Sequence, residues 1–137
     1  MKHLLLALLS ACLPYAASAH TDAYFDAIDT PHHGQMRTAG PYHLELVVAA
    51  REWLLYVADH ANGPIEVAGA SALAEVTHAG KVHTVQFAPS GANVLRADVK
   101  LRPGRQTTIA ITLRMPGQEP QTAVFRPARK ASAKSQH

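Results

Sequence analysis

The feature that most constrains the fold is an alternation of apolar and polar residues with period two, which begins at Tyr42 and recurs along most of the chain. Tyr42, Leu44 and Leu46 fall on one face of the first run. His43 and Glu45 fall on the other face. Successive side chains of a β-strand point to opposite sides of a sheet, so a run of this kind predicts a strand with one buried face.

Residues that favour turns separate these runs, as in Asn62-Gly63-Pro64 and Pro103-Gly104. The first two runs are joined by a connection too short for a parallel crossover, so they should form an antiparallel hairpin. The pattern predicts an all-β fold, a small antiparallel β-sandwich of six to seven strands that is either immunoglobulin-like or barrel-like. The predicted strands cover 42–48, 53–58, 71–77, 82–88, 94–101, 107–114 and 122–125.

The N-terminus predicts export. Lys2 and His3 precede an apolar run too short to span a bilayer, and small residues follow at Ala17 and Ala19. We therefore expect a signal peptide over residues 1–19 and a periplasmic location. The alternative is cleavage at a lipobox-like sequence that ends in Cys12, which would anchor the protein to a membrane through lipid, although Cys12 comes early for such a site. Cys12 is the chain's single cysteine, so no internal disulfide can form.

The remaining chain divides into three parts. Residues 20–36 are predicted to form an exposed N-terminal arm, whose few large apolar residues, Tyr24, Phe25 and Ile28, form a short helix or pack across a sheet edge. Residues 37–126 form the β domain. Residues 127–137 are predicted to be a disordered basic tail because they have almost no apolar bulk. The formal net charge of +3 is too small to indicate nucleic-acid binding.

Histidine is unusually frequent, with 9 residues in 137. Folding the predicted hairpin about Ala50 sets His43 near Val57, and therefore within one or two residues of Asp59 and His60. The arm ends at the same place. Imidazole and carboxylate groups gathered there would suit zinc, copper(II) or nickel, and the thioether of Met36 would suit copper(I). The competing interpretation is a set of solvated surface histidines. The candidate metal ligands are His32, His33, His43, Glu45, Asp59 and His60.

Three of the histidines outside this set are His20, His78 and His83. His20 would become the N-terminal residue after cleavage at Ala19, where its α-amino group and imidazole could chelate copper(II). His78 and His83 flank a predicted hairpin turn and are interpreted as solvated residues.

Four segments of the chain carry a family resemblance: 33–36, 40–47, 55–60 and the turn Asn62-Gly63-Pro64. Together they resemble small periplasmic proteins linked to heavy-metal efflux, and a similar module attached to adaptor subunits of efflux pumps of the resistance-nodulation-division type. The resemblance extends loosely over 33–125 and lacks the second glycine that the pattern has after its first histidine. It implies a β domain that binds or buffers copper or zinc outside the inner membrane, with a pump adaptor as partner, and its matching positions are His33, His43, Glu45 and His60.

Nothing in the sequence indicates an enzyme. There is no cysteine beyond Cys12, no Gly-x-Ser-x-Gly elbow, no phosphate-binding glycine loop and no His-Glu-x-x-His motif. We therefore expect a non-catalytic periplasmic protein that buffers or carries copper or zinc. The alternative is an interaction module, in which an exposed strand or the basic tail docks onto a membrane protein or anionic surface and the histidines are incidental.

Overall fold

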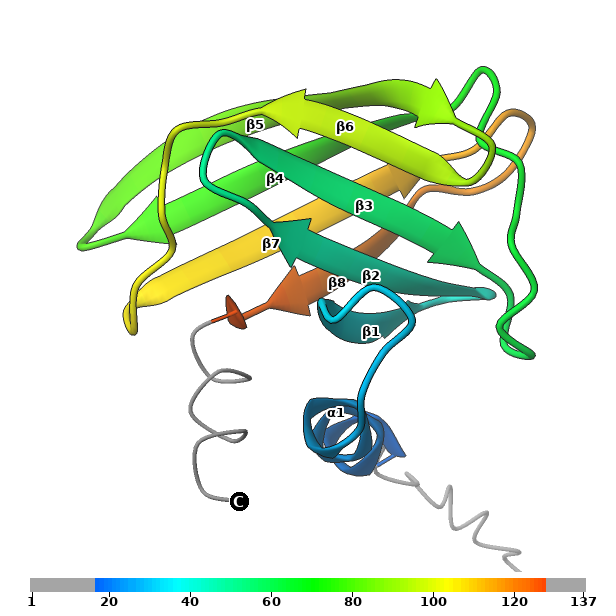
Figure 1. The fold of residues 1–137 in the computed structure, drawn as a ribbon, viewed down its shortest axis with the longest axis horizontal. Helices are drawn as coiled ribbons and strands as arrows, with labels where there is room; N and C mark the ends of the chain where they lie inside the picture. The colour runs from blue at the N-terminus through cyan, green and yellow to red at the C-terminus, as the bar shows by residue number, and fades with distance from the viewer. Residues whose placement is uncertain (1–16, 128–137) are drawn as a thin grey trace, which may run out of the picture.

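The structure, a computed structural model, describes residues 17–127, with side chains from residue 22 onward. Most of the predicted signal peptide, Cys12 and nearly all of the predicted basic tail lie outside the described residues. None of the described helices has the length and apolar character needed to cross a membrane. The elements are α1 (Ala17–Ala27), β1 (Gln35–Ala39), β2 (Tyr42–Val48), β3 (Glu52–Ala58), β4 (Ser71–His78), β5 (Lys81–Gly91), β6 (Val94–Asp98), β7 (Thr107–Arg114) and β8 (Gln121–Phe125) (Figure 1).

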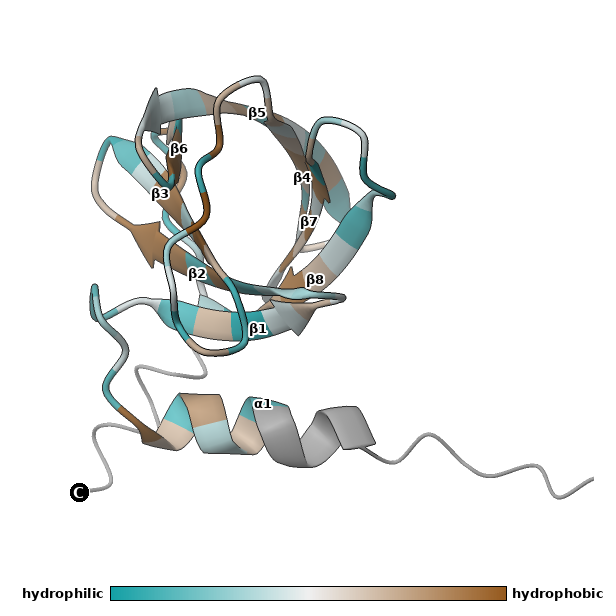
Figure 2. Ribbon diagram, turned by 90° about the vertical axis from the view of Figure 1, so that its right-hand side faces the viewer, coloured by the Kyte–Doolittle hydropathy of each residue, from teal (hydrophilic) through white to brown (hydrophobic). Residues whose placement is uncertain are grey.

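The strands form one antiparallel sheet in the order β1-β2-β3-β6-β5-β4-β7-β8, which curls into a nearly closed barrel (Figure 2). The prediction of an all-β antiparallel fold is confirmed. The predicted hairpin of β2 and β3 is also present, with His43 opposite Ala58 and Glu45 opposite Tyr56. This register places the outward-facing residues of β2 beside those of β3, on the face that carries the candidate site.

The structure has eight strands where the sequence predicted six to seven, and the strand that was not foreseen is β1. Together with α1, β1 is built largely from residues that were expected to form an exposed arm. Gln35 and Arg37 of β1 lie opposite the buried Leu46 and Leu44 of β2. Polar residues at these two positions remove the apolar alternation by which a strand is recognised.

Gln35 closes the seam between β1 and β8. Its side-chain amide donates a hydrogen bond to the carbonyl oxygen of Arg126 (3.0 Å) and accepts one from the backbone N–H of Arg126 (2.7 Å). The side chain therefore supplies the two bonds that a neighbouring strand would otherwise make. The same amide and the guanidinium of Arg37 both donate to Asp26 of α1, at 3.1 and 3.0 Å, so these buried polar groups fasten α1 beside β1.

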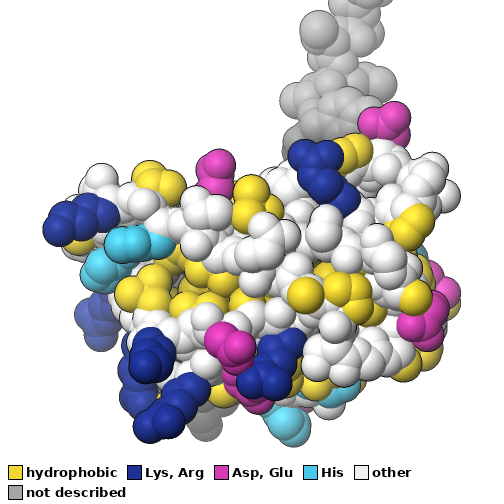
Figure 3. Space-filling view, turned by 90° about the horizontal axis from the view of Figure 1, so that it is seen from above, with side chains coloured by type: hydrophobic (Ala, Val, Ile, Leu, Met, Phe, Trp, Pro, Cys, Tyr) yellow, Lys and Arg dark blue, Asp and Glu magenta, His cyan; other side chains and the backbone are white. Residues whose placement is uncertain are grey.

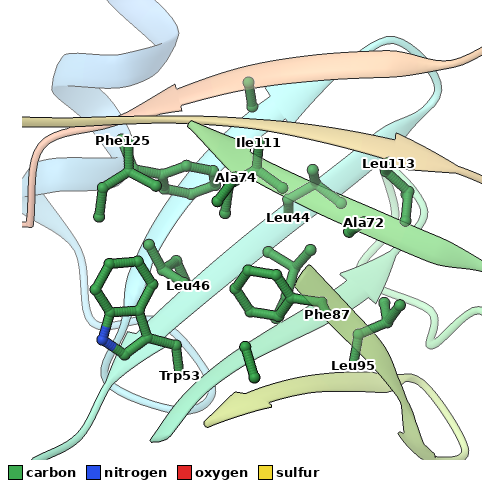
Figure 4. Close-up of a cluster of buried hydrophobic side chains, with 14 of the residues drawn as sticks. Leu44, Leu46, Trp53, Ala72, Ala74, Phe87, Leu95, Ile111, Leu113 and Phe125 are labelled. Atoms are coloured by element: carbon green, nitrogen blue, oxygen red, sulfur yellow. The ribbon is translucent and has the colours of Figure 1, made fainter. Parts of the chain in front are cut away.

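Large apolar side chains fill the interior of the barrel (Figure 4). Burial alternates strictly along β7, and the fully buried residues include the aromatic side chains Trp53, Phe87 and Phe125. Each large side chain removed from water contributes about 1.5–3 kcal/mol, so this core is the main source of stability.

Besides the seam between β1 and β8, the barrel wall is open between the first half of β5 and the segment that follows β6. β5 pairs with β4 from Lys81 to Phe87, but with β6 only from Ala88 to Gly91, across an irregular register. The first half of β5 consequently has a strand neighbour on one side alone among the described residues.

Candidate functional site

The candidate site lies on the outer face of β1, β2 and β3. Met36, Glu45 and Tyr56 occupy one row across the three strands, and His43 lies in the neighbouring row of β2. Since the side chains between them point into the core, the period-two alternation itself directs this set outward.

Two adjoining hollows follow this face, and Pro31, Met36, His43 and Asn62 line both of them. The larger hollow, of about 600 Å³, also reaches His60 and α1. The smaller one, of about 280 Å³, continues over His32, Glu45 and Tyr56. We call the two together the outer groove.

His43 and His60 form the most distinctive pair in the outer groove. Their rings stack with centroids 4.8 Å apart and planes 17° from parallel. Nδ1 of His43 lies 3.1 Å from the side-chain oxygen of Asn62, and Nε2 of His60 lies 2.9 Å from the carbonyl oxygen of Gly40. Both oxygens can only accept, so both ring nitrogens are donors.

These hydrogen bonds determine which nitrogen is available for a ligand. In the neutral form, Nε2 of His43 and Nδ1 of His60 carry the lone pairs. Histidines that bind metals in proteins almost always donate their other ring N–H to a carbonyl or carboxylate oxygen, which fixes the tautomer and the ring orientation. The pair His43–His60 has this arrangement at both rings.

Phe25 and Met36 support the pair. The Phe25 ring of α1 meets the His43 ring edge-on, with centroids 5.1 Å apart, and only 6% of Phe25 is exposed. Met36 is buried and lines both hollows together with His43. A thioether therefore lies at the wall of the groove that holds the two imidazoles.

Glu45 forms a second pair, with His32. Its carboxylate accepts hydrogen bonds from the backbone N–H of His32 (3.0 Å), the backbone N–H of Gly34 (2.8 Å) and Nδ1 of His32 (2.9 Å). Burial raises the pKa of Glu45, but hydrogen bonds from the Thr30 side chain, from His32 and from Gly34 outweigh burial and lower it below its ordinary value. The carboxylate is thus ionised and binds the 30–34 loop to β2.

The rings of His32 and Tyr56 stack nearly parallel, with centroids 3.5 Å apart and planes 5° from parallel. Tyr56 is the residue opposite Glu45 in β3. His32 is therefore held by its ring nitrogen on one side and by its ring face on the other.

Asp59 and His33 lie in turns. The Asp59 carboxylate accepts hydrogen bonds from the backbone N–H groups of Ala61 (2.9 Å) and Gly63 (2.8 Å), which shapes the turn that carries Asn62. His33 is exposed, has a positive φ of 60° and donates its backbone N–H to Thr30 (3.1 Å).

The six predicted ligands therefore separate into two pairs and two turn residues. His43 lies with His60, and His32 lies with Glu45. Among the side chains that the structure describes, those of residues 22–127, no three from His, Cys, Asp or Glu lie close enough together to hold one metal ion. The sequence did not indicate the parts played by Phe25, Asn62 and Tyr56, although the hairpin register could have placed Tyr56 beside Glu45.

No protein-family model, no curated protein and no solved structure matches the chain. What the structure itself defines is a small antiparallel β-barrel that carries a histidine- and methionine-lined groove on its outer wall.

Proposed function

We propose that this protein is a non-catalytic metal carrier or buffer of the bacterial periplasm, which binds one copper(I) ion in the outer groove through His43, His60 and Met36. The observation that carries the proposal is the hydrogen bonding of the histidine pair, which leaves one lone pair on each ring beside a thioether. Thioether and imidazole ligands suit copper(I).

The choice of copper(I) over zinc follows from the other groups in the groove. Zinc sites generally take three or four ligands from cysteine, histidine and carboxylate side chains. The carboxylates of Glu45 and Asp59 are already engaged with backbone N–H groups. The next available donor beside the two histidines is the sulfur of Met36.

The two rings lie nearly parallel, so one of them must turn for both lone pairs to reach a shared ion. His60 is exposed and follows the end of β3, so its ring has room to turn, and in turning it exchanges the hydrogen bond to Gly40 for the bond to the ion, while His43 keeps its bond to Asn62. A site on an exposed turn also suits transfer of the ion to another protein. A pump adaptor as recipient rests on the resemblance of the sequence to efflux-associated proteins, and the periplasmic location rests on the signal-peptide pattern.

The proposal is tested by titrating the purified protein with copper(I) without oxygen, in competition with a coloured copper(I) chelator. We expect one equivalent to bind. His60→Ala and Met36→Leu should weaken binding by at least about tenfold, comparable to the loss on removing a metal site's supporting groups. His83→Ala is the matched control, because His83 is exposed on β5 and remote from the groove in the sheet order.

Zinc is titrated in parallel. Met36→Leu should leave zinc binding unchanged, because zinc gains little from a thioether. Equal copper(I) affinity in wild type, His60→Ala, Met36→Leu and His83→Ala would overturn the proposed site.

A further inference from the structure

The opening between β5 and β6 arises because two strands separate before their ladder is complete. Ala88 of β5 lies opposite Arg96 of β6. Continuing that register would place Gln86 opposite Asp98 and Thr84 opposite Lys100, but these residues do not pair. A hollow of about 590 Å³ lies there instead, lined by residues 83–86 and 98–101. We call this hollow the β5 slot.

The first wall of the β5 slot is a strand edge with unused backbone groups. β4 and β5 are joined through Ala79 and Gly80, whose φ angles of 48° and 76° are those of a two-residue type I′ turn. In such a hairpin the flanking residues form a hydrogen-bonded pair, and the bonded pairs then alternate along the ladder. The backbone groups of Val82, Thr84 and Gln86 therefore point away from β4 and into the slot.

The second wall is the segment that follows β6. The backbone N–H of Val99 donates to the carbonyl of Arg51 (3.1 Å), on the side away from β5. By the same alternation, the backbone groups of Asp98 and Lys100 face the slot. Within the described part of the chain, no backbone hydrogen bond joins 82–86 to 98–101.

The floor of the slot is apolar and its rim is basic. Val85, Val99 and Leu101 contribute apolar surface, and the outward-facing Val82 is 63% exposed. Figure 3 shows apolar side chains along the floor of a furrow on this face, with Lys and Arg side chains gathered toward its left end. Lys100 lines the slot, and three further cations lie within four residues of its lining along the chain: Lys81, Arg102 and Arg105.

None of these four cations forms an ion pair with a described residue. The acidic residue of the slot, Asp98, is already paired with Arg96, at 2.8 Å. The rim therefore presents positive charge that is not neutralised within residues 17–127.

We propose that the β5 slot binds an extended acidic segment of a partner protein, which adds as a strand between β5 and residues 98–101. The strand edges would supply backbone hydrogen bonds, the floor would take alternate apolar side chains and the rim would pair with carboxylates. A second copy of this chain fits less well, because its β5 edge, Lys81–Gly91, has no acidic residue to pair with the basic rim.

The experiment uses the full-length protein and a blocked hexapeptide of alternating Glu and Val as the probe. Binding is measured by isothermal titration and by backbone amide exchange at residues 82–86. Thr84→Pro is the decisive variant, since it removes an N–H that faces the slot and leaves the hydrogen bonds to β4 in place. Thr84→Ala is its control, because it changes the same side chain and keeps the N–H.

We expect the peptide to slow amide exchange at Thr84 and Gln86. Binding should be about tenfold weaker in Thr84→Pro than in Thr84→Ala, because a backbone hydrogen bond is lost and its partner is left unpaired. The double variant Lys100→Glu, Arg102→Glu should also weaken binding, and added salt should weaken it in wild type. A peptide of alternating Lys and Val should not bind.

Equal peptide affinity in Thr84→Pro and Thr84→Ala would overturn the proposal. So would binding to phosphatidylglycerol vesicles without binding to the peptide, which would make the basic rim a lipid-binding surface. Concentration-dependent dimerisation that the peptide does not reverse would likewise overturn it in favour of self-pairing. None of these measurements depends on copper, so the result is independent of the proposed metal site.

Discussion

At the scale of single residues, Glu45 shows how one buried carboxylate can organise a loop. Only 2% of Glu45 is exposed, yet it is surrounded by N–H donors from His32 and Gly34. Gly34 is close to the neighbouring strand, where an added Cβ would lie 2.5 Å from the carbonyl oxygen of Leu46. The loop can approach β2 this closely because residue 34 has no side chain.

Glu45→Gln should therefore destabilise the protein, by roughly 1.5–3 kcal/mol at pH 7, because a charged acceptor is lost among buried donors. The pKa of Glu45 is lowered from 4.5 on folding, so the ionised carboxylate stabilises the protein above that pH and loses its contribution as the pH falls through the lowered pKa. The difference in unfolding free energy between wild type and Glu45→Gln should shrink in that acidic range. Urea unfolding from pH 7 downward measures it.

Glu75→Gln serves as the control for this experiment, since Glu75 is exposed on β4. Its effect on stability should be small at every pH. A difference for Glu45→Gln that stays constant down to the acidic limit would contradict the assigned hydrogen bonds.

Residue type and the predicted hairpin selected Glu45 and Asp59 as candidate metal ligands, and the family resemblance also included Glu45, but none of these could indicate which backbone donors each carboxylate would meet. Those donors belong to a loop and a turn whose shapes depend on β1 pairing with β2 and on the positive φ of Asn62. The proximity of His43 and His60 could be predicted from the sequence, because the hairpin register places His43 opposite Ala58, two residues before His60. The register estimated from a fold about Ala50 was one residue off, with His43 opposite Ala58 rather than Val57.

At the scale of elements, the strands with an apolar inner face could be predicted from the sequence, whereas β1, which lies at the seam with β8, could not. β7 spans Thr107–Arg114, as the alternation predicted, and burial follows that alternation residue by residue. β1 was not predicted because Gln35 and Arg37 occupy inward-facing positions that are apolar in the other strands. The polar partners that explain these two residues are Arg126, which is 91 residues from Gln35 in the sequence, and Asp26 of α1, which is brought beside β1 by folding.

The hairpin of β4 and β5 offers a stabilising substitution. Ala79 has a φ of 48°, a conformation that costs residues with a Cβ roughly 1–2 kcal/mol and that asparagine tolerates better. Since Asn-Gly is a favoured sequence for a type I′ turn, Ala79→Asn should raise stability by about 0.5–1 kcal/mol. Thermal unfolding followed by circular dichroism should show a higher midpoint.

Ala92→Asn provides the comparison, because Ala92 lies in the turn between β5 and β6 and does not have a positive φ. It should give no increase in the midpoint. Equal effects of the two substitutions would mean that asparagine acts through the solvent-exposed surface and not through the turn conformation.

At the scale of the whole molecule, closure of the barrel depends on the Gln35 side chain, whose amide bonds to the backbone of Arg126 as a neighbouring strand would. Gln35→Leu removes both hydrogen bonds to Arg126 and leaves that backbone N–H and carbonyl without these partners. We expect a loss of about 1–3 kcal/mol and faster hydrogen exchange of the Arg126 amide. Gln118→Leu is the control, since Gln118 is exposed in the turn before β8. Unchanged exchange at Arg126 in Gln35→Leu would show that the seam is held by other contacts.

The interior of the barrel is occupied by its own side chains, so the outer groove is carried on the wall and contributes no part of the core. The shape of the barrel therefore does not depend on an ion in the outer groove. Small zinc domains, by contrast, collapse when their ion is withdrawn. On the proposed function, the ion could therefore pass to another protein without any change in the core of the barrel.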